Sequence, residues 1–480
     1  MISKLAVISA ASSLLAGCAT VPDVPVRPDL AVSKVSFDNS NERIFSAAEI
    51  NSSWWQDFDD PLMTGLIEDA LAKNKDLAVA EANLEIAQAF LDRRTLGRSV
   101  STQSIAGLDL GRQARDGADV ELTANGQVGA SWEYDAFGRI ASIIESAEFD
   151  FIAAQEARRD VAVIIASETA LAYTDLRGNQ VRLTVAQANA DLQADSLDLL
   201  RTLFDNGRAT RLDVERAEAQ YRATLASLPI FEADIRTASA RLVTLTGQTG
   251  LADTPLVRTA LTTTEQTPRP PAILAAGSPE ILIRRRPDIR AVEAEIASLL
   301  ALGDADRARL FPTITLNADL LSFFSEDNDF GDSFGFGIGP SIVWEGPDLR
   351  RVRADIDLAD AQTVLAYARY QAAVVNALGE VEIALVNYAQ EQARRKDLEA
   401  AAASAERAVD LARLRFEEGL DDFLDVIDAQ RTLLDAQGTL ENSRLNTTRQ
   451  AIAAYRSLGG IWETEALNAV SQSGVRSNAP

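Results

Sequence analysis

The sequence predicts an α+β membrane protein in which one large unit, a strand hairpin followed by very long helices, is used twice. Three observations support this prediction. The two halves of the chain match each other at a fixed offset of 212 residues, four short stretches alternate apolar and polar residues, and two long segments contain no proline. A repeat of this size fixes the architecture before any single element does.

The internal repeat is a match without net gap between the two halves of the chain. One block of identities returns 212 residues later, so that Phe204-x-x-Gly207-x-x-x-x-Leu212-Asp213-Val214 becomes Phe416-x-x-Gly419-x-x-x-x-Leu424-Asp425-Val426. The same offset relates further identical pairs: Asp76 with Asp288, Trp132 with Trp344, and Gly247 with Gly459. Duplication of one unit explains all of these matches together.

Two strands are predicted in each copy, because apolar and polar residues alternate with the period of a β-strand. The alternation is clearest at 122–134, and it recurs at 100–110, 312–322 and 334–344. A loop rich in Gly, Arg and Asp, at 111–119, separates the first pair of strands, and an acidic loop, at 325–332, separates the second. We therefore expect one hairpin in each copy, with one apolar face and one hydrated face.

Each hairpin is followed by a helix of unusual length. The segments 139–206 and 351–418 contain no proline, and each would span roughly 100 Å at 1.5 Å per residue. Each segment ends at a glycine, Gly207 or Gly419, which suits a helix C-cap. A single compact domain does not need helices this long.

The residues after each glycine predict a second, antiparallel helix. Thr210 and Asp422 suit N-caps, and an aspartate follows each of them after three residues, as in a capping box. These aspartates are Asp213 and Asp425. The return helices would run at about 212–246 and 424–457. The two Phe-x-x-Gly blocks, with Phe204 and Phe416, therefore form two helix–turn–helix tips.

The remaining segments set the domain boundaries. A helix is expected at 62–96, where apolar residues recur at spacings of three, four and seven, and the prolines of 251–280 predict an extended linker. Trp54 and Trp55 are expected to pack an extended N-terminal segment onto the body. We divide the chain into a lipoprotein signal peptide at 1–17, a lipidated extension at 18–61, a first copy at 62–250, the linker at 251–280, a second copy at 281–462 and a C-terminal tail at 463–480.

The N-terminus has the features of a secreted, lipid-anchored protein. Lys4 precedes a short apolar run, and Leu15-Ala16-Gly17-Cys18 follows it. The run is too short to span a membrane and reads as a cleaved signal. Its end resembles a bacterial lipoprotein box, which implies acylation of Cys18, and Ala19 after it fits sorting to the outer membrane. The alternative is an ordinary signal peptide in which Cys18 is incidental.

Composition excludes several classes of function. The chain contains no histidine, so Ser-His-Asp and Cys-His catalysis and every histidine-based metal site are ruled out. The net charge of −25 makes nucleic acid an unsuitable partner, since binding it requires basic patches. We expect neither enzymatic activity nor a cofactor.

The strands lead to a physical inference about assembly. The mature chain contains no apolar run near the length of a membrane helix, so no transmembrane helix is expected. Backbone crosses a bilayer only as helices or as a closed barrel, and closure needs about eight strands. Several chains would therefore share one barrel, which a tube of long helices continues. The alternative is a small soluble sheet that caps a periplasmic coiled coil.

Motifs along the whole mature chain carry a resemblance to a known family. They are Trp54-Trp55-x-x-Phe58-x-Asp60-Pro61, Trp132-Glu133-Tyr134-Asp135-x-Phe137-Gly138-Arg139, Arg285-Arg286-Pro287-Asp288-Ile289, Phe311-Pro312-x-Ile314, Leu424-Asp425-Val426-Ile427-Asp428-Ala429-Gln430 and Leu458-Gly459-Gly460-x-Trp462. Together they resemble the TolC-type outer-membrane efflux proteins (the outer membrane factor family), in the lipidated branch typified by OprM and called NodT-like.

The resemblance implies a homotrimer in the cell outer membrane, anchored by lipid and extended into the periplasm. Its fold would be a twelve-stranded β-barrel continued by a periplasmic α-helical tunnel. The implied partners are a periplasmic adaptor protein and an inner-membrane pump of the resistance-nodulation-division class. The implied function is passive export of small molecules. The alternatives are a type I secretion tunnel for proteins and a non-conducting periplasmic coiled-coil lipoprotein.

The resemblance also implies the candidate site residues. Asp425 and Asp428 match family aspartates that constrict the pore, and in a trimer they would form an acidic ring that attracts cations. Asp213 is a candidate for contacts that hold the tip closed, with helix capping as its alternative. A basic residue common two positions after the tip glycine is Asp421 here, so Arg208 and Arg211 of the first copy are candidates for those contacts.

Overall fold

The computed structural model describes residues 44–46, 48, 51–111, 121–263, 266–271, 273–275, 277–324 and 334–460. These residues all belong to one compact unit, 36–480. Cys18, the signal peptide at 1–17 and the tail at 463–480 lie outside the described residues, and so do most residues of the two hairpin loops. The roles assigned to them above stay predictions.

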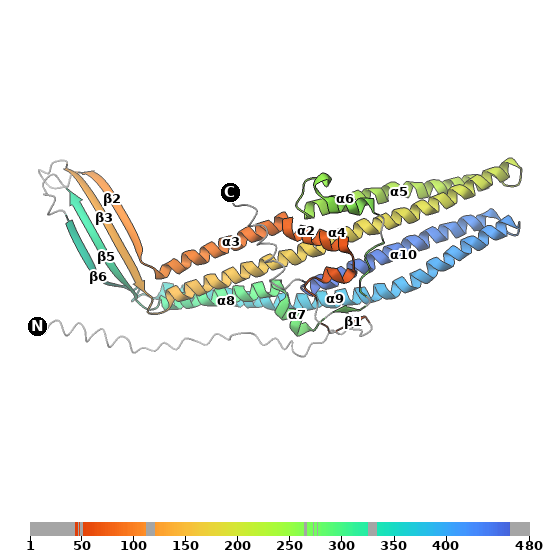
Figure 1. The fold of residues 1–480 in the computed structure, drawn as a ribbon. Helices are drawn as coiled ribbons and strands as arrows, with labels where there is room; N and C mark the ends of the chain where they lie inside the picture. The colour runs from red at the N-terminus through yellow and green to blue at the C-terminus, as the bar shows by residue number, and fades with distance from the viewer. Residues whose placement is uncertain are drawn as a thin grey trace, which may run out of the picture. The chain divides into compact units, whose positions relative to one another are not determined.

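Two very long helices organise the unit (Figure 1). Helices α4 (Arg139–Asp205) and α9 (Arg350–Glu417) contain 67 and 68 residues. Each is followed by a return helix of 35 residues that packs back along it, α5 (Arg211–Leu245) along α4 and α10 (Phe423–Ser457) along α9. Nearer the sheet, α3 (Lys75–Thr95) lies along α4, and α8 (Pro287–Ala308) lies along both long helices. Each long helix is thus flanked by shorter helices placed end to end.

The helix expected at 62–96 is two helices, α2 (Pro61–Lys73) and α3, so that prediction is wrong at Asn74. The side-chain oxygen of Asn74 accepts hydrogen bonds from the backbone N–H groups of Asp76 and Leu77, at 2.8 and 3.1 Å. Its amide nitrogen donates to the carbonyl of Leu245 at 2.9 Å. Asn74 therefore caps α3 and also ties it to the end of α5.

The linker expected to be extended at 251–280 contains a helix, α6 (Pro255–Thr262), and two residues of strand, β4 (Leu274–Ala275). Helix α6 begins at a proline, which suits a first turn, and buries Val257 and Ala260. A 3-10 turn, η4 (Leu251–Asp253), precedes it, and a short helix, α7 (Pro279–Arg285), follows the linker. The extended prediction is wrong because prolines also start helices.

The segment before α2 is anchored by its two tryptophans. Trp54 and Trp55 are 0% and 4% exposed, and the ring of Trp54 stacks on Tyr455 with 5.1 Å between centroids. The predicted packing onto the body is confirmed. The segment is not extended there, because Trp54–Phe58 forms a 3-10 helix, η2. Upstream of it, β1 (Phe45–Ser46) pairs in parallel with β4.

The four long strands form one antiparallel sheet. Its order is β2 (Ser101–Gly111), β3 (Glu121–Tyr134), β5 (Thr313–Phe324) and β6 (Phe334–Val343), so the two hairpins of the duplicated unit lie side by side. Helix α4 follows β3 after a short turn, and α9 follows β6 in the same way. Within the part of the chain that the structure describes, the outer edges of β2 and β6 have no partner strand.

The two faces of the sheet differ in polarity, as the alternation predicts. One row across the sheet joins Val128, Leu320 and Phe336, and these side chains are 51%, 50% and 88% exposed. On the other face Ser131 hydrogen-bonds Asn317 at 2.9 Å, and further polar side chains follow it along the strands. A single chain therefore leaves a broad apolar surface in contact with its surroundings.

Helix α9 contains an 18-residue window that is apolar enough to cross a membrane by length and composition, with a mean hydropathy of 1.2. The expectation that no such run exists is wrong on this criterion. A single window of this kind is weak evidence for a membrane span, since core helices of soluble proteins pass the same test. Only 33% of the window is buried within the protomer.

Candidate functional site

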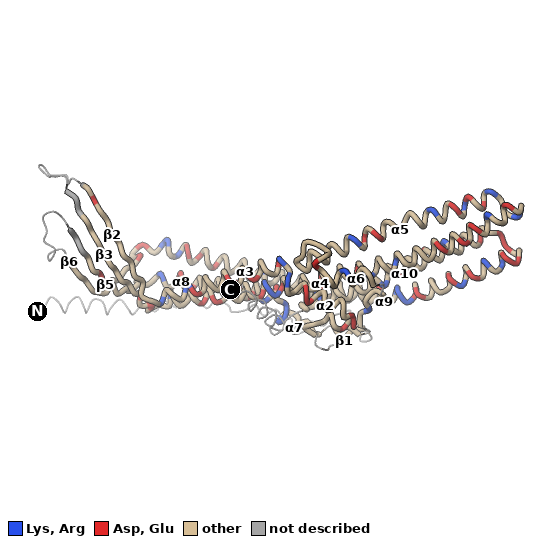
Figure 2. The backbone as a smooth tube through the Cα atoms, turned by 45° about the horizontal axis from the view of Figure 1, so that its top comes forward, with Lys and Arg blue, Asp and Glu red and all other residues tan. Residues whose placement is uncertain are grey.

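The candidate site is the tip formed by the two helix–turn–helix turns, α4–α5 and α9–α10. Both turns lie at the end of the unit opposite the sheet (Figure 1). Acidic and basic residues follow one another along both helix pairs towards this end (Figure 2). The turns come from equivalent positions of the two copies, so differences between them show where the copies have diverged.

The two turns end their long helices in the same way. Gly207 and Gly419 have φ values of 69° and 71°, a left-handed conformation that glycine adopts without strain. The N–H of each glycine donates to the carbonyl of the phenylalanine three residues earlier, Phe204 or Phe416, at 2.9 Å. The next N–H reaches one residue further back, at 2.7 Å in the first turn and 2.8 Å in the second. Both ends are therefore Schellman motifs.

The two turns start their return helices differently. In the first, the N–H of Asp213 donates to the hydroxyl of Thr210 at 3.2 Å, and the carboxylate of Asp213 accepts from the Thr210 N–H at 3.1 Å, which completes a capping box. In the second, the side chain of Asp422 makes no capping hydrogen bond. The predicted second capping box is wrong, because the N–H of Asp425 donates to the backbone carbonyl of Asp422, at 3.1 Å, and not to its carboxylate.

An ion pair stabilises the second turn in place of the missing cap. The Nη2 of Arg415, in the last turn of α9, donates to Asp421 at 2.8 Å. This guanidinium lowers the pKa of Asp421, and Asp421 in turn raises the pKa of Arg415. The first copy has Leu203 and Ala209 at the equivalent positions, so it cannot form the pair. The sequence reasoning missed this contact, although the unusual Asp421 was the signal that could have revealed it.

The predicted constriction residues lie on α10 just beyond this turn. Asp425 and Asp428 are exposed and stand about one helical turn apart. Among the described residues, no hydrogen bond or ion pair is recorded for either carboxylate. The structure does not bring Arg208 or Arg211 to them within one protomer, since Arg211 pairs with Glu215 on its own helix at 2.7 Å. Asp213 is engaged in its capping box.

The two turns are joined by a small apolar core with side chains from both copies. Phe416 contacts Phe423 edge to face with 5.0 Å between centroids, whereas its counterpart Phe204 is 37% exposed. The core consists of Leu197, Leu200, Val214, Ala217, Phe423 and Val426. Above it, neutral hydrogen bonds connect α4 and α10, from Gln430 to Ser196 and from Asn189 to Gln437, both at 2.8 Å. The two helix pairs are therefore packed and hydrogen-bonded to each other near the tip.

We expect Thr210→Ala to loosen the start of α5, because it removes the acceptor for the Asp213 N–H. Loss of such an N-cap costs about 1 kcal/mol. The matched change Asp422→Ala should have little effect, since that side chain caps nothing. Hydrogen exchange of the first-turn amides of α5 and α10, followed by mass spectrometry, measures both. Equal acceleration at the two turns would contradict the difference in capping described here.

Comparison with known proteins places this architecture in one family. A family model described as "Outer membrane efflux protein" matches residues 66–248 and again residues 279–460. The chain is 29% identical to Nodulation protein T of Rhizobium leguminosarum bv. trifolii, over 89% of this chain and 91% of that protein. It is 28% identical to the toluene efflux pump outer membrane protein TtgF of Pseudomonas putida, over 95% and 96% of the two chains.

Solved structures agree with these sequence matches. The outer-membrane channel OprN is similar to this chain with a TM-score of 0.82 and 32% identity, over 91% of this chain and 99% of that one. CusC, a transmembrane channel, has a TM-score of 0.81 over 92% and 100% of the two chains, and at 23% identity it shows the fold alone. The chain therefore belongs to the outer membrane efflux protein family and is the outer-membrane channel component of a tripartite efflux system.

Proposed function

We propose that three copies of this chain form a twelve-stranded barrel in the outer membrane, continued into the periplasm by a tunnel of helices. The observation that carries this proposal is the four-stranded sheet with an exposed apolar face and two unpaired edges. In lipid the unpaired N–H and C=O groups of β2 and β6 would each cost several kcal/mol. Pairing β6 of one copy with β2 of the next removes every edge and turns the apolar face to lipid.

The helices support the same assembly. Large apolar side chains of α9 remain exposed in the single chain, among them Val364 at 68% and Val375 at 65%. Helix α3 exposes Val79 at 61% and Ile86 at 54%. Neighbouring copies that pack along these faces would bury them, which accounts for an apolar helix outside the membrane. A soluble coiled-coil spacer would leave the apolar face of the sheet unexplained.

The aspartates Asp425 and Asp428 then form the narrow acidic entrance of the tunnel. Three copies of each carboxylate make a ring that attracts cations and disfavours anions. Asp213, which its capping box holds, and Arg208 and Arg211 lie on the neighbouring turn and are proposed to contact the next copy there. The extruded compounds are small molecules, as the toluene pump relative suggests.

The proposed partners follow from the position of the tip. A periplasmic adaptor protein would dock around the two turns, and an inner-membrane pump of the resistance-nodulation-division class would deliver the compounds. In this proposal the outer-membrane component is a passive duct. Acylation of Cys18 would add a lipid anchor to the barrel.

The proposal is tested with purified protein in detergent and in planar bilayers. We expect a trimeric mass and ion conductance that multivalent cations block from the tip side. The double variant Asp425→Ala/Asp428→Ala should weaken this block by about tenfold or more, because the charge ring is lost. Asp234→Ala on α5 serves as the control, and multivalent cations should block its conductance as strongly as that of the unmodified protein.

A monomeric mass together with an absence of conductance would refute the assembly. A conducting trimer whose block is unchanged in the double variant would refute only the acidic entrance. The two results separate the fold of the duct from the role of its aspartates.

A further inference from the structure

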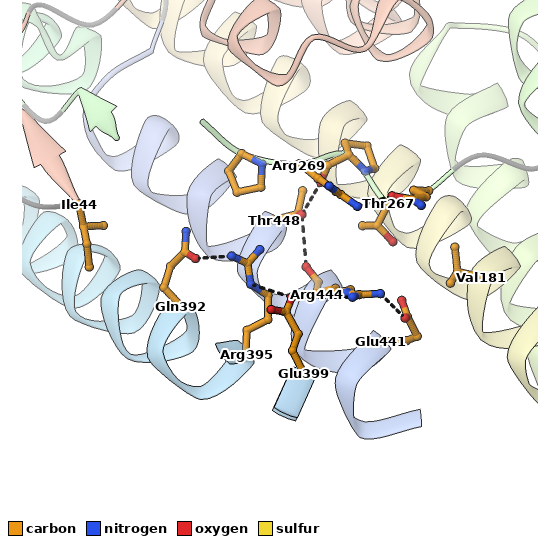
Figure 3. Close-up of a pocket in the computed structure, with 13 residues that line it drawn as sticks. Ile44, Val181, Thr267, Arg269, Gln392, Arg395, Glu399, Glu441, Arg444 and Thr448 are labelled. Atoms are coloured by element: carbon orange, nitrogen blue, oxygen red, sulfur yellow. Dashed lines mark hydrogen bonds and ion pairs between the residues drawn. The ribbon is translucent and has the colours of Figure 1, made fainter. Parts of the chain in front are cut away.

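A cavity of about 970 Å³ lies midway along the protomer, far from both the sheet and the tip. It is enclosed by the strap (defined here as residues 266–271 of the linker), by α9 and by α10, and Ile44 and Val181 complete its wall (Figure 3). This volume is at the upper end of the range for small-molecule sites.

Three arginines from three different elements line the cavity: Arg269, Arg395 and Arg444. Only Arg444 forms an ion pair shorter than 3 Å with a carboxylate of the residues that the structure describes. Arg444 of α10 pairs with Glu441 at 2.7 Å and lies 3.7 Å from Glu399 (Figure 3). These two glutamates are the only carboxylates among the described residues that line the cavity. With Arg269 and Arg395 included, the lining carries three positive and two negative charges.

The other two guanidiniums have neutral hydrogen-bond partners. Arg395 donates to the side-chain oxygen of Gln392 at 2.9 Å, and its Nε is 3.9 Å from Glu399, beyond hydrogen-bonding distance. That Nε is buried and has no hydrogen-bond partner. Arg269 of the strap donates to Gln266. The Nε of Arg395 is itself closed off from solvent, so an incoming oxyanion would bind the remaining part of this side chain, which is 29% exposed.

The remaining wall is uncharged and is held in place. The hydroxyl of Thr267 is buried without a hydrogen-bond partner, and Pro268 and Pro270 add apolar surface. The backbone of the strap is fixed by hydrogen bonds from Thr448 to the carbonyl of Pro268, at 2.6 Å, and from Tyr388 to that of Pro271, at 3.3 Å. The cavity is therefore formed before any ligand arrives, which lowers the entropic cost of binding.

We propose that this cavity binds a small organic anion, an apolar body with one carboxylate that Arg395 and Arg269 hold between α9 and the strap. Two guanidinium groups offer forked donors that match a carboxylate, and the prolines with Ile44 and Val181 face its apolar part. Such a ligand would fasten the strap, which connects the two copies, to the long helix of the second copy. Binding of this anion goes beyond the export function.

The experiment uses three probes that share the naphthalene ring and carry a negative, a positive or an uncharged polar group: 1-naphthoate, 1-naphthylmethylammonium and 1-naphthalenemethanol. Each is titrated into the purified full-length protein in a nonionic detergent by isothermal calorimetry, with detergent alone as the blank for micelle partitioning. We expect saturable binding of naphthoate, one molecule per chain, at least about tenfold tighter than either other probe. Arg395→Gln and Arg269→Gln should each weaken it by a similar factor.

Arg407→Gln is the matched control, since Arg407 lies on the same helix α9 but donates to Ser404 and does not line the cavity. It should bind naphthoate like the unmodified protein. Circular dichroism checks that each variant is folded, and the comparison of the three probes needs no variant at all. Equal binding of the alcohol or the amine, no saturable heat with naphthoate, or unchanged affinity in both cavity variants would overturn the proposal.

Discussion

Gly247→Ala is expected to destabilise the protein severely. Gly247 follows α5 with a φ of 71°, and a Cβ built on it would stand 2.1 Å from the carbonyl oxygen of Lys73. The left-handed conformation and the displacement of backbone around α2 together cost about 2–5 kcal/mol. A large drop in the thermal unfolding midpoint, followed by circular dichroism of the detergent-solubilised protein, is the expected readout.

Two further glycines separate the causes of this effect. Gly207 has nearly the same φ, 69°, but open space where a Cβ would be, so Gly207→Ala should cost about 1 kcal/mol from the backbone alone. Gly379 lies within α9 and also faces open space, so Gly379→Ala should be neutral or stabilising. If Gly247→Ala unfolded at the same temperature as Gly207→Ala, the close approach of Lys73 would carry no energy.

Arg177→Met is expected to have a comparable effect through lost hydrogen bonds. Arg177 is fully buried in α4 and donates to the backbone carbonyls of Ala260 and Thr263, at 3.1 and 2.5 Å, at the end of α6. It also donates to the hydroxyl of Tyr173 at 2.9 Å. Methionine fills similar space but removes the donors to the Thr263 carbonyl and the Tyr173 hydroxyl, at a cost of about 1–3 kcal/mol for each buried acceptor left unpaired, while the Ala260 carbonyl keeps the side-chain amide of Gln180 at 2.9 Å. Thermal unfolding and hydrogen exchange of α6 measure this loss.

Arg182→Met on the same helix is the control for this change. Arg182 is only partly buried, and its guanidinium lies 4.7 Å from the centre of the Phe231 ring, a contact worth about 1 kcal/mol or less at an exposed site. Its loss should leave α6 protected from exchange. If the Arg177→Met protein were as stable as the Arg182→Met protein, the prediction would be wrong. Water would then satisfy the hydrogen-bond acceptors of Arg177 without loss of unfolding free energy.

The extended architecture could be predicted because it depends on period and length. Alternation of period two located the four strands to within a few residues, and it also separated the apolar face with Val128 from the polar face with Ser131. The absence of proline gave the long helices, and the glycines gave their ends. These signals are local and are repeated over many residues, so single exceptions do not hide them.

The structural features that could not be predicted from the sequence depend on single residues and on contacts between distant parts of the chain. Asn74 interrupts a regular apolar period because its side chain caps one helix and reaches Leu245, which is distant in the chain. Helix α6 forms among prolines because α4 provides Arg177 for its final carbonyls. The second capping box was expected from residue types alone, and it fails because the N–H of Asp425 bonds the backbone carbonyl of Asp422 in place of its side chain.

The candidate site shows the same division. Gly207 and Gly419 were recognisable from their spacing, and the structure places them in matching turns. The ion pair of Arg415 with Asp421 could not be recognised from the sequence. It forms only because the turn brings the second residue after Gly419 next to the last turn of α9. The cavity beneath the strap was invisible for the same reason, since Arg269, Arg395 and Arg444 are far apart in sequence.

The unpaired outer strands have a consequence for inheritance. In the barrel proposed above, a chain with a damaged β2 or β6 would still pair through its intact edge with a normal copy, and the resulting barrel would stay open. One mutant subunit would inactivate an assembly that also contains normal subunits. Mutations in these strands should therefore be dominant in cells that also carry a normal gene. Lesions that stop a chain from folding at all would remove it before it met the others, and should be recessive.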